Sequence, residues 1–123
     1  MADKPEIDFP QGPPPTDLEI TDLTEGDGAS AISGRSVSVH YVGVAHSSGE
    51  EFDASYDRGD PLDFRLGVGQ VIAGWDQGVQ GMKVGGRRRL VIPPDLAYGD
   101  RGAGGAIAPG ETLIFVVDLV DVR

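Results

Sequence analysis

Beyond Asp17, apolar and polar residues alternate with a period of two along most of the chain, and glycines and prolines interrupt the alternation at short intervals. A period of two places successive side chains on opposite faces of a β-strand. In residues 36–44, Val39 and Tyr41 therefore share one face, while Ser38 and His40 share the other. This pattern is typical of antiparallel strands joined by tight turns, with one face of the sheet buried.

Strands are predicted over residues 18–24, 36–44, 62–66, 87–92 and 112–122. The last of them is apolar on both faces until Asp118 and Asp121 interrupt it, which is typical of a central strand. Prolines 93 and 94 end the strand before it, because proline cannot donate a hydrogen bond to a neighbouring strand.

One segment has the period of a helix, since four apolar residues are spaced by three, four and three: Ile72, Trp75, Val79 and Met82. Gly74 and Gly78 lie inside the segment, and each costs a helix about 0.8 to 1 kcal/mol relative to alanine. The helix must therefore be held by packing against the sheet, and it is expected to end at Gly81. The predicted architecture is an α+β domain in which an antiparallel sheet packs against one helix.

The N-terminus differs from the rest, because five of the nine prolines lie in the first fifteen residues. Residues 1–16 are predicted to be a proline-rich, flexible tail with polyproline II character around residues 13–15. A spacer is favoured over a recognition motif for this tail, and both remain open. Residues 17–123 are predicted to form one domain, since the chain of 123 residues has the usual size of one domain.

Composition excludes several classes of function. The chain has no cysteine, which rules out disulfides, thiolate metal sites and thiol nucleophiles. A formal charge of -10 opposes binding to nucleic acid or to anionic membranes. The first residues do not have the pattern of a secretion signal, and no apolar run is long enough to span a membrane. A cytoplasmic, monomeric protein is expected.

Several chemical sites are also disfavoured. His40 and His46 do not have the spacing of metal ligands, and an ordinary hydrogen-bonded role is expected for His40. The carboxylates between Asp53 and Asp63 lack the register of a calcium loop and are interpreted as a solvated acidic loop. No nucleophile elbow is present, and surface ion pairing is expected for the arginines at 87–89. We therefore expect neither a metal nor another cofactor.

Aromatic and polar residues gather beside glycine-rich turns in five motifs: Val39-His40-Tyr41-Val42-Gly43, Glu51-Phe52-Asp53-Ala54-Ser55, Val71-Ile72-Ala73-Gly74-Trp75, Pro93-Pro94-Asp95-Leu96-Ala97-Tyr98-Gly99 and Leu113-Ile114-Phe115. In order and spacing, these motifs resemble the signatures of FKBP-type peptidyl-prolyl cis-trans isomerases. The resemblance extends from about Asp17 to Arg123. It implies that family's fold, a strongly twisted antiparallel sheet of about five strands wrapped around one short helix, with the site between them.

The resemblance also implies roles for individual residues. Trp75 would form the floor of a pocket beneath the proline ring, and the other substrate-binding residues would be Tyr41, Phe52, Leu62, Phe64, Val71, Ile72, Tyr98, Ile107 and Phe115. The expected catalytic residues are Asp53, Ile72, Trp75, Tyr98 and Phe115. Tyr98 and the backbone amide of Ile72 would each donate a hydrogen bond to a substrate carbonyl, and Asp53 would lie at the pocket edge, oriented by Tyr41 and Arg58.

The chain departs from the family pattern at two single residues and in one loop, where Ala103-Gly104-Gly105-Ala106 and Ala108 replace a bulkier segment that is richer in proline. Leu62 stands where an aromatic residue is common, and Gln70 stands where a glutamate is common. The loop over residues 99–110 is rich in glycine and is expected to be mobile.

The implied activity needs neither a nucleophile nor a metal, because rotation about an X-Pro bond breaks no covalent bond. The expected partners are proline-containing polypeptides and, as family membership implies, ligands such as tacrolimus and rapamycin. Two alternatives stay open: a module or weak chaperone that binds proline peptides without accelerating rotation, and a structural partner that acts through its tail or acidic surface.

Overall fold

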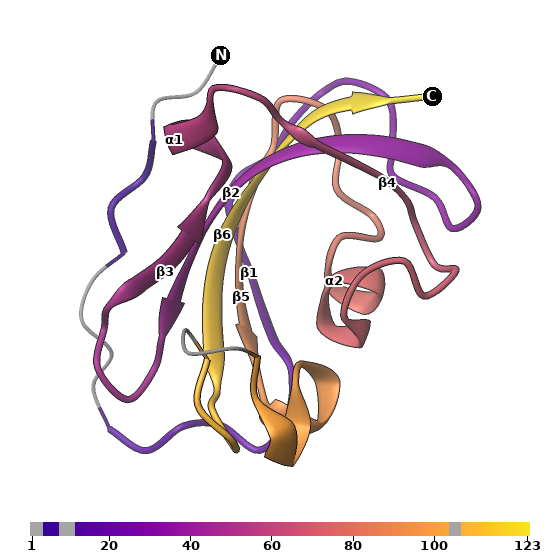
Figure 1. Ribbon diagram of the computed structural model, residues 1–123. Coiled ribbons are helices and arrows are strands. Elements are labelled where there is room, and N and C mark those ends of the chain that lie inside the picture. The colour runs from indigo at the N-terminus through magenta and orange to yellow at the C-terminus, as the bar shows by residue number, and fades with distance from the viewer. Residues whose placement is uncertain (1–3, 8–11, 104–106) are drawn as a thin grey trace.

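The computed structural model describes residues 4–7, 12–103 and 107–123, which form a curved antiparallel sheet with a short helix on its concave side (Figure 1). The sheet contains six strands in these residues: β1 (Glu19–Thr24), β2 (Ser36–Ala45), β3 (Glu51–Ala54), β4 (Leu62–Arg65), β5 (Arg87–Ile92) and β6 (Leu113–Val122). Their order is β1-β5-β6-β2-β3, and β4 also pairs with β2. The α+β architecture and the central position of the last strand are confirmed.

The structure has one strand more than the sequence predicted. β3 pairs with the second half of β2, at Val42 to Val44, whereas β4 pairs with the first half, at Ser36 to Val39. The sequence analysis missed β3 because its carboxylates were interpreted as part of a solvated loop. The structure therefore corrects that interpretation for Asp53, which belongs to β3.

Helix α2 (Ala73–Gly78) is shorter than predicted, because Ile72 is its N-cap and Val79 its C-cap. The other helical segments are single turns: α1 (Ser55–Arg58), η1 (Pro94–Leu96) and η2 (Gly99–Arg101). None of the helices in the described part of the chain is long and apolar enough to cross a membrane.

The two glycines of α2 lie against β5. A Cβ atom at Gly74 would lie 2.4 Å from Cγ2 of Ile92, and one at Gly78 would lie 2.7 Å from Cδ2 of Leu90. Only glycine allows the helix axis to come this close to the sheet. The main core fills the space between them and includes Leu90, Ile92 and Trp75.

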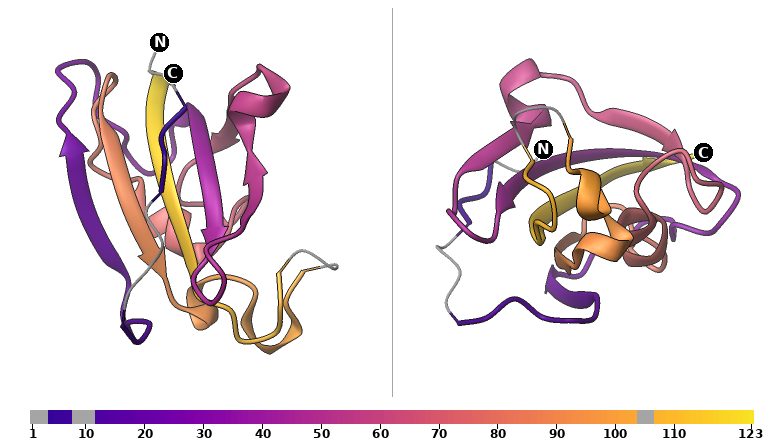
Figure 2. Two further views of the ribbon diagram at one scale, coloured as in Figure 1. Left: turned by 90° about the vertical axis from the view of Figure 1, so that its left-hand side faces the viewer. Right: turned by 60° about the horizontal axis from the view of Figure 1, so that its bottom comes forward.

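Residues 4–7 lie on the opposite, outer face of the sheet (Figure 2, left). Ile7 packs there against a small buried cluster of Val44, Val91 and Ile114, from β2, β5 and β6. Lys4 makes ion pairs of 2.9 Å with both Glu51 and Asp57. The described part of the predicted tail thus contacts the domain. Phe9 and Pro10 lie outside the described residues, and so do residues 104–106 of the glycine-rich loop. The boundary at residue 16 and the tail's flexibility stay predictions.

The three arginines of β5 are not all at the surface. Arg87 makes an ion pair with the buried carboxylate of Asp118 at 2.7 Å. Arg88 is only 9% exposed and makes an ion pair with Asp22 of β1 at 2.6 Å. The expectation of surface ion pairing is therefore wrong for Arg88, because its side chain lies on the same face of β5 as Leu90 and Ile92.

Candidate active site

A pocket of about 440 Å³ opens between α2 and the concave face of the sheet. Five separate parts of the fold supply its walls: β2, β3, β6, the segment from β4 to α2, and the loop after β5. The lining residues are Tyr41, Phe52, Asp53, Leu62, Gln70, Val71, Ile72, Trp75, Tyr98 and Phe115. Tyr41 and Phe115, which are 74 positions apart in the sequence, are brought together in the pocket because β2 pairs with β6.

Trp75 is 4% exposed and is held by aromatic rings on several sides. Its ring centroid lies 4.9 Å from that of Tyr41 at an interplanar angle of 78°, and 5.1 Å from that of Phe115 at 84°. Phe52 continues the cluster, with its ring 5.5 Å from Phe115 at 89°. Edge-to-face contacts of this kind are favourable and fix ring orientation, so the pocket has a rigid apolar floor.

A polar network lies at one side of this floor. Tyr41 donates a hydrogen bond of 2.5 Å from its hydroxyl to Oδ2 of Asp53. Arg58 donates to Oδ1 of Asp53 at 2.6 Å and to the Tyr41 hydroxyl oxygen at 2.8 Å. The predicted orientation of Asp53 by Tyr41 and Arg58 is therefore present in the structure.

The network fixes the charge states of its members. Burial alone would raise the pKa of Asp53, but hydrogen bonds from Tyr41 and Arg58 outweigh it and hold that pKa below its usual value. Burial raises the pKa of Tyr41, and its hydrogen bond to Asp53 raises it further. At neutral pH, Asp53 is therefore an anion paired with Arg58, and Tyr41 keeps its proton.

Two hydrogen-bond donors to which the sequence analysis assigned a substrate carbonyl have no partner among the residues that the structure describes, and the buried indole Nε1–H of Trp75 has none either. One of the two is the hydroxyl of Tyr98, a residue that is 40% exposed. The other is the backbone N–H of Ile72, the N-cap of α2, whose carbonyl is used by Trp75 and Asp76. Both donors are available to a ligand.

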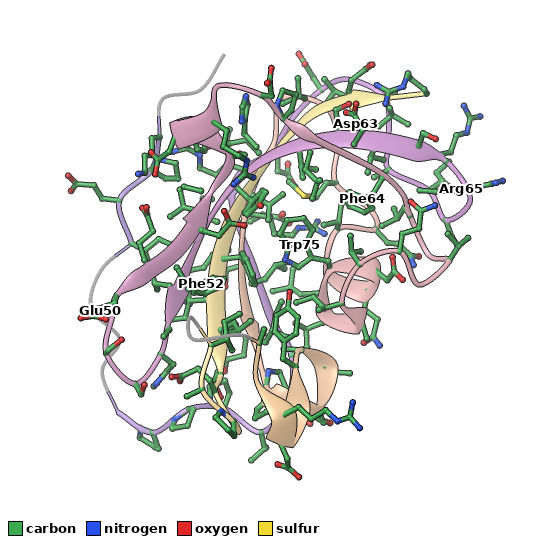
Figure 3. The ribbon with its side chains drawn as sticks, in the orientation of Figure 1. Glu50, Phe52, Asp63, Phe64, Arg65 and Trp75 are labelled. Carbon is green, nitrogen blue, oxygen red and sulfur yellow. The ribbon has the colours of Figure 1, made fainter. Side chains whose placement is uncertain are left out.

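The structure brings together nine of the eleven residues that the sequence analysis assigned to the site. The two others, Phe64 and Ile107, are absent from the pocket lining. Phe64 is 6% exposed and packs behind Trp75, with ring centroids 5.7 Å apart. Figure 3 shows Phe64 and Trp75 directed inward, while Asp63 and Arg65 on the same strand point outward. Ile107 is buried in the core and pairs with Ala103 across the loop.

Gln70 also lines the pocket, although the sequence analysis noted it only as a departure from a pattern. Its side-chain oxygen accepts a hydrogen bond of 2.8 Å from the backbone N–H of Arg65. The interaction closes the turn between β4 and α2, and no periodicity in the sequence could have revealed it.

Among the described residues that line the pocket there is no serine, threonine, histidine, cysteine or lysine. Within the described ranges, no group of three or more acidic or histidine side chains could hold a metal ion. The pocket is thus suited to bind and desolvate an apolar group while donating hydrogen bonds to nearby carbonyls.

The model of the family described as FKBP-type peptidyl-prolyl cis-trans isomerase matches residues 28–120 of this chain. The chain belongs to that family. An FK506-binding protein of Streptomyces anulatus is 74% identical over 121 residues, covering 98% of each chain. A peptidyl-prolyl cis-trans isomerase of Saccharomyces cerevisiae is 57% identical over 93 residues, which cover 76% of this chain and 69% of the relative. The crystal structure of AtFKBP13 superposes with a TM-score of 0.79 at 44% identity, covering 86% and 93% of the two chains.

Membership of this isomerase family establishes the chain as a peptidyl-prolyl cis-trans isomerase. The fold of the family is also confirmed, because the twisted antiparallel sheet and its few helices match those of the solved FKBP structures.

Proposed function

We propose that the pocket around Trp75 is where the chain isomerises X-Pro bonds, with the proline ring packed against the indole. The observation that carries this proposal is a rigid aromatic pocket with two unpaired donors, the Tyr98 hydroxyl and the Ile72 amide, at its edge. A pyrrolidine ring is compact and apolar, and it offers no N–H group that would need a partner.

Rotation about the peptide bond faces a barrier of about 18 to 20 kcal/mol, because the planar amide is stabilised by resonance. The twisted amide has lost that conjugation and is less dipolar, so it loses less hydration when it enters an apolar pocket. The pocket therefore binds the transition state better than either planar isomer. Each factor of ten in rate requires about 1.4 kcal/mol of such preference.

The polar groups keep the peptide in place while the bond rotates. The Ile72 N–H would donate to one substrate carbonyl and Tyr98 to another, which anchors the chain on both sides of the rotating bond. Asp53 would act at the pocket edge as a fixed anion, because Arg58 and Tyr41 already satisfy its oxygens. No proton transfer is needed.

We also propose that tacrolimus and rapamycin occupy the same pocket and compete with peptide. The printed name of the Streptomyces relative, FK506-binding protein, supports this, since FK506 is tacrolimus. Trp75 is the only tryptophan, so its fluorescence reports on ligands at this pocket alone.

A protease-coupled assay with an X-Pro peptide tests the proposal. The intact protein is expected to accelerate isomerisation above the buffer rate, and tacrolimus is expected to abolish the acceleration while changing Trp75 emission. Replacing Trp75 by Leu should lower kcat/KM by at least about tenfold, through loss of the aromatic floor. Folded protein that binds the peptide without accelerating its rotation would instead be a binding module.

A further inference from the structure

Helix α2 packs on three consecutive inward-facing residues of β5. Ile92 lies against Gly74, and Leu90 lies against Gly78, at the contact distances that glycine alone permits. Arg88 is the third residue on this face, two positions before Leu90. The strand thus supports the first part of the helix with apolar side chains and the end of the helix with a guanidinium group.

Arg88 binds the end of α2 directly. Its Nη1 donates to the carbonyl oxygen of Gly78 at 2.8 Å and to that of Gln80 at 2.9 Å. No other hydrogen-bond donor to these two carbonyls is found in the described part of the chain. Because the last carbonyls of a helix have no partner within it, one side chain here satisfies two groups that would otherwise be unpaired.

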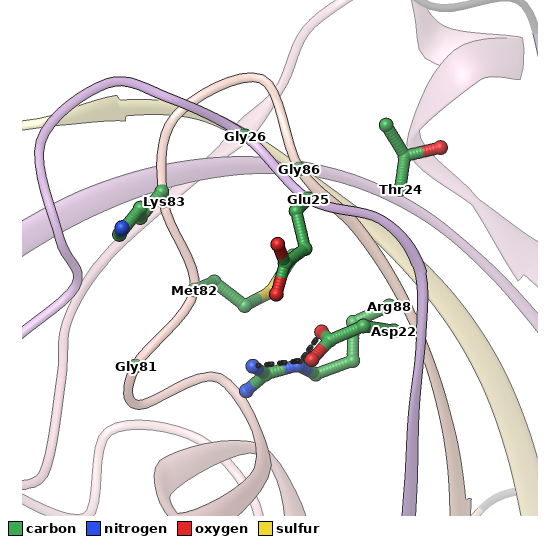
Figure 4. A pocket seen from close by; sticks show the side chains of 9 residues that line it. All are labelled: Asp22, Thr24, Glu25, Gly26, Gly81, Met82, Lys83, Gly86 and Arg88. Atoms are coloured by element: carbon green, nitrogen blue, oxygen red, sulfur yellow. Dashed lines mark hydrogen bonds and ion pairs between the residues drawn. The ribbon is translucent and has the colours of Figure 1, made fainter.

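Asp22 fixes the direction of this side chain from the neighbouring strand. It lies opposite Arg88 in the pairing of β1 with β5 and accepts a hydrogen bond of 2.6 Å from Nε. Figure 4 shows the two side chains in contact beside the loop that follows α2. Burial of a charged guanidinium is tolerated only with such a partner, and a cation at a helix C-terminus is favoured by the helix dipole.

The first part of the helix has further anchors, because Asp76 accepts hydrogen bonds of 2.9 Å from the backbone N–H groups of Gly67 and Gly69 and Trp75 packs among aromatic rings, but its end has fewer. The helix has six residues, two of which are glycines, and its N-cap residue makes no side-chain hydrogen bond. Isolated helices of this length are unstable in water. Among the described residues, Arg88 provides the only polar contact between β5 and the C-terminal end of α2.

A shift of the C-terminal end of α2 would also displace the residues of the pocket floor. The Trp75 carbonyl accepts the N–H of Val79 at 2.9 Å, and the Ile72 carbonyl accepts the N–H of Trp75 at 2.9 Å. One continuous hydrogen-bonded turn thus joins the helix end that Arg88 holds to the pocket residues Trp75 and Ile72.

We propose that Arg88, aimed by Asp22, is a positioning residue for isomerisation, which holds Trp75 and the Ile72 amide in place from the far side of α2. The inference rests on the proposed function of the Trp75 pocket. It gives a specific role to one member of the arginine run that the reaction itself does not use.

The test compares Arg88→Met with Arg89→Met in the full chain. Both variants remove one arginine from β5, but Arg89 points to the outer face beside Pro13 and His46. Three quantities are measured well below the unfolding temperature: kcat/KM per folded protein, the Kd of tacrolimus, and acrylamide quenching of Trp75. In Arg88→Met we expect kcat/KM to fall about tenfold, Kd to rise by a similar factor and quenching to increase. In Arg89→Met all three should match the unchanged protein.

Two milder variants complete the test. Arg88→Lys, which keeps the charge, should restore part of the lost activity, and Asp22→Asn should shift all three quantities in the same direction as Arg88→Met but less. If Arg88→Met does not fold, Arg88→Lys and Asp22→Asn test the positioning role instead. A lower melting temperature with kcat/KM and quenching equal to those of Arg89→Met would refute the positioning role. Quenching is measured without substrate, so it tests the position of Trp75 even if the pocket proves not to be the substrate site.

Discussion

Tyr41 and Tyr98 both bring a hydroxyl group to the pocket, but the two groups differ in what they can still bind. The Tyr41 hydroxyl donates to Asp53 and accepts from Arg58, so it is already used. The Tyr98 hydroxyl has no partner among the residues described. The resemblance already implied different roles for the two tyrosines, and the structure gives the hydrogen bonds that occupy the Tyr41 hydroxyl.

Replacing Tyr98 by Phe removes the available hydroxyl and keeps the ring. We expect kcat/KM to fall about three- to tenfold, which corresponds to one net hydrogen bond. The free energy of unfolding should not change, because the hydroxyl makes no interaction within the described protein. Peptide assays combined with urea unfolding measure the two effects.

Tyr56→Phe is the matched control for Tyr98→Phe. The Tyr56 hydroxyl donates to the buried carboxylate of Asp118, away from the pocket. Its loss should lower the free energy of unfolding by about 1 to 2 kcal/mol and leave kcat/KM of the folded protein unchanged. If the two variants lost activity equally, the assigned role of Tyr98 would be wrong.

The charge states in the Asp53 network predict a flat pH profile. Asp53 has a lowered pKa and Tyr41 a raised one, so neither group titrates near neutrality. We expect kcat/KM to be constant from about pH 5 to about pH 9. Ionised Asp53 also stabilises the folded state above about pH 4, and this contribution is lost as the pH falls through its lowered pKa. An inflection near neutral pH that vanishes in Asp53→Asn would contradict this assignment.

At the scale of elements, helix α2 shows what periodicity can and cannot predict. The spacing of its apolar residues correctly indicated a helical segment with Trp75 facing the sheet. It overestimated the length, because Val79 and Met82 stay buried after the helix has ended. The hydrogen bonds from Arg88 could not be predicted either, since they depend on the distance between a helix end and a strand 8 to 10 residues later in the chain.

The close contact between α2 and β5 predicts the effect of Gly74→Ala. Alanine favours a helix by about 0.8 to 1 kcal/mol over glycine, which by itself would stabilise the protein. The new Cβ would, however, lie 2.4 Å from Cγ2 of Ile92, and a β-branched side chain in the core cannot turn away. We expect the free energy of unfolding to fall by about 1 to 3 kcal/mol. Gln77→Ala, at an exposed position of α2, is the control and should be neutral or slightly stabilising; equal gains in both variants would disprove the contact argument.

At the scale of the whole molecule, the resemblance of five motifs was enough to predict the family, the α+β fold and most of the pocket. The motifs could not predict contacts between residues that are far apart in the sequence. Strand β3 was missed because Asp53 was interpreted as part of a solvated loop. Phe64 and Ile107 lie in the core and outside the pocket lining, which motif positions could not show, and their contact with substrate stays a prediction. The contact of Ile7 with the outer face was also missed, since a single apolar residue in a proline-rich segment has no pattern. Location in the cytoplasm and the monomeric state stay predictions.

Removing residues 1–16 tests the contribution of the N-terminal segment. Ile7 covers Val44, Val91 and Ile114 only partly, so we expect the free energy of unfolding to fall by about 1 kcal/mol. The value of kcat/KM should not change, because Ile7 packs on the outer face of the sheet and the pocket opens on the concave face. Ile7→Ala in the full chain should reproduce most of the loss. An unchanged stability in both variants would mean that the segment is a free spacer.

The pocket is lined by residues from Tyr41 to Phe115, brought together by strands that pair across almost the whole domain. A fragment or a partly folded chain could therefore not form part of the pocket with part of its activity. The rate of proline isomerisation is accordingly a measure of how many molecules are native. Activity and the native emission spectrum of Trp75 should be lost together in a denaturant titration, so that this enzyme can serve as its own folding reporter.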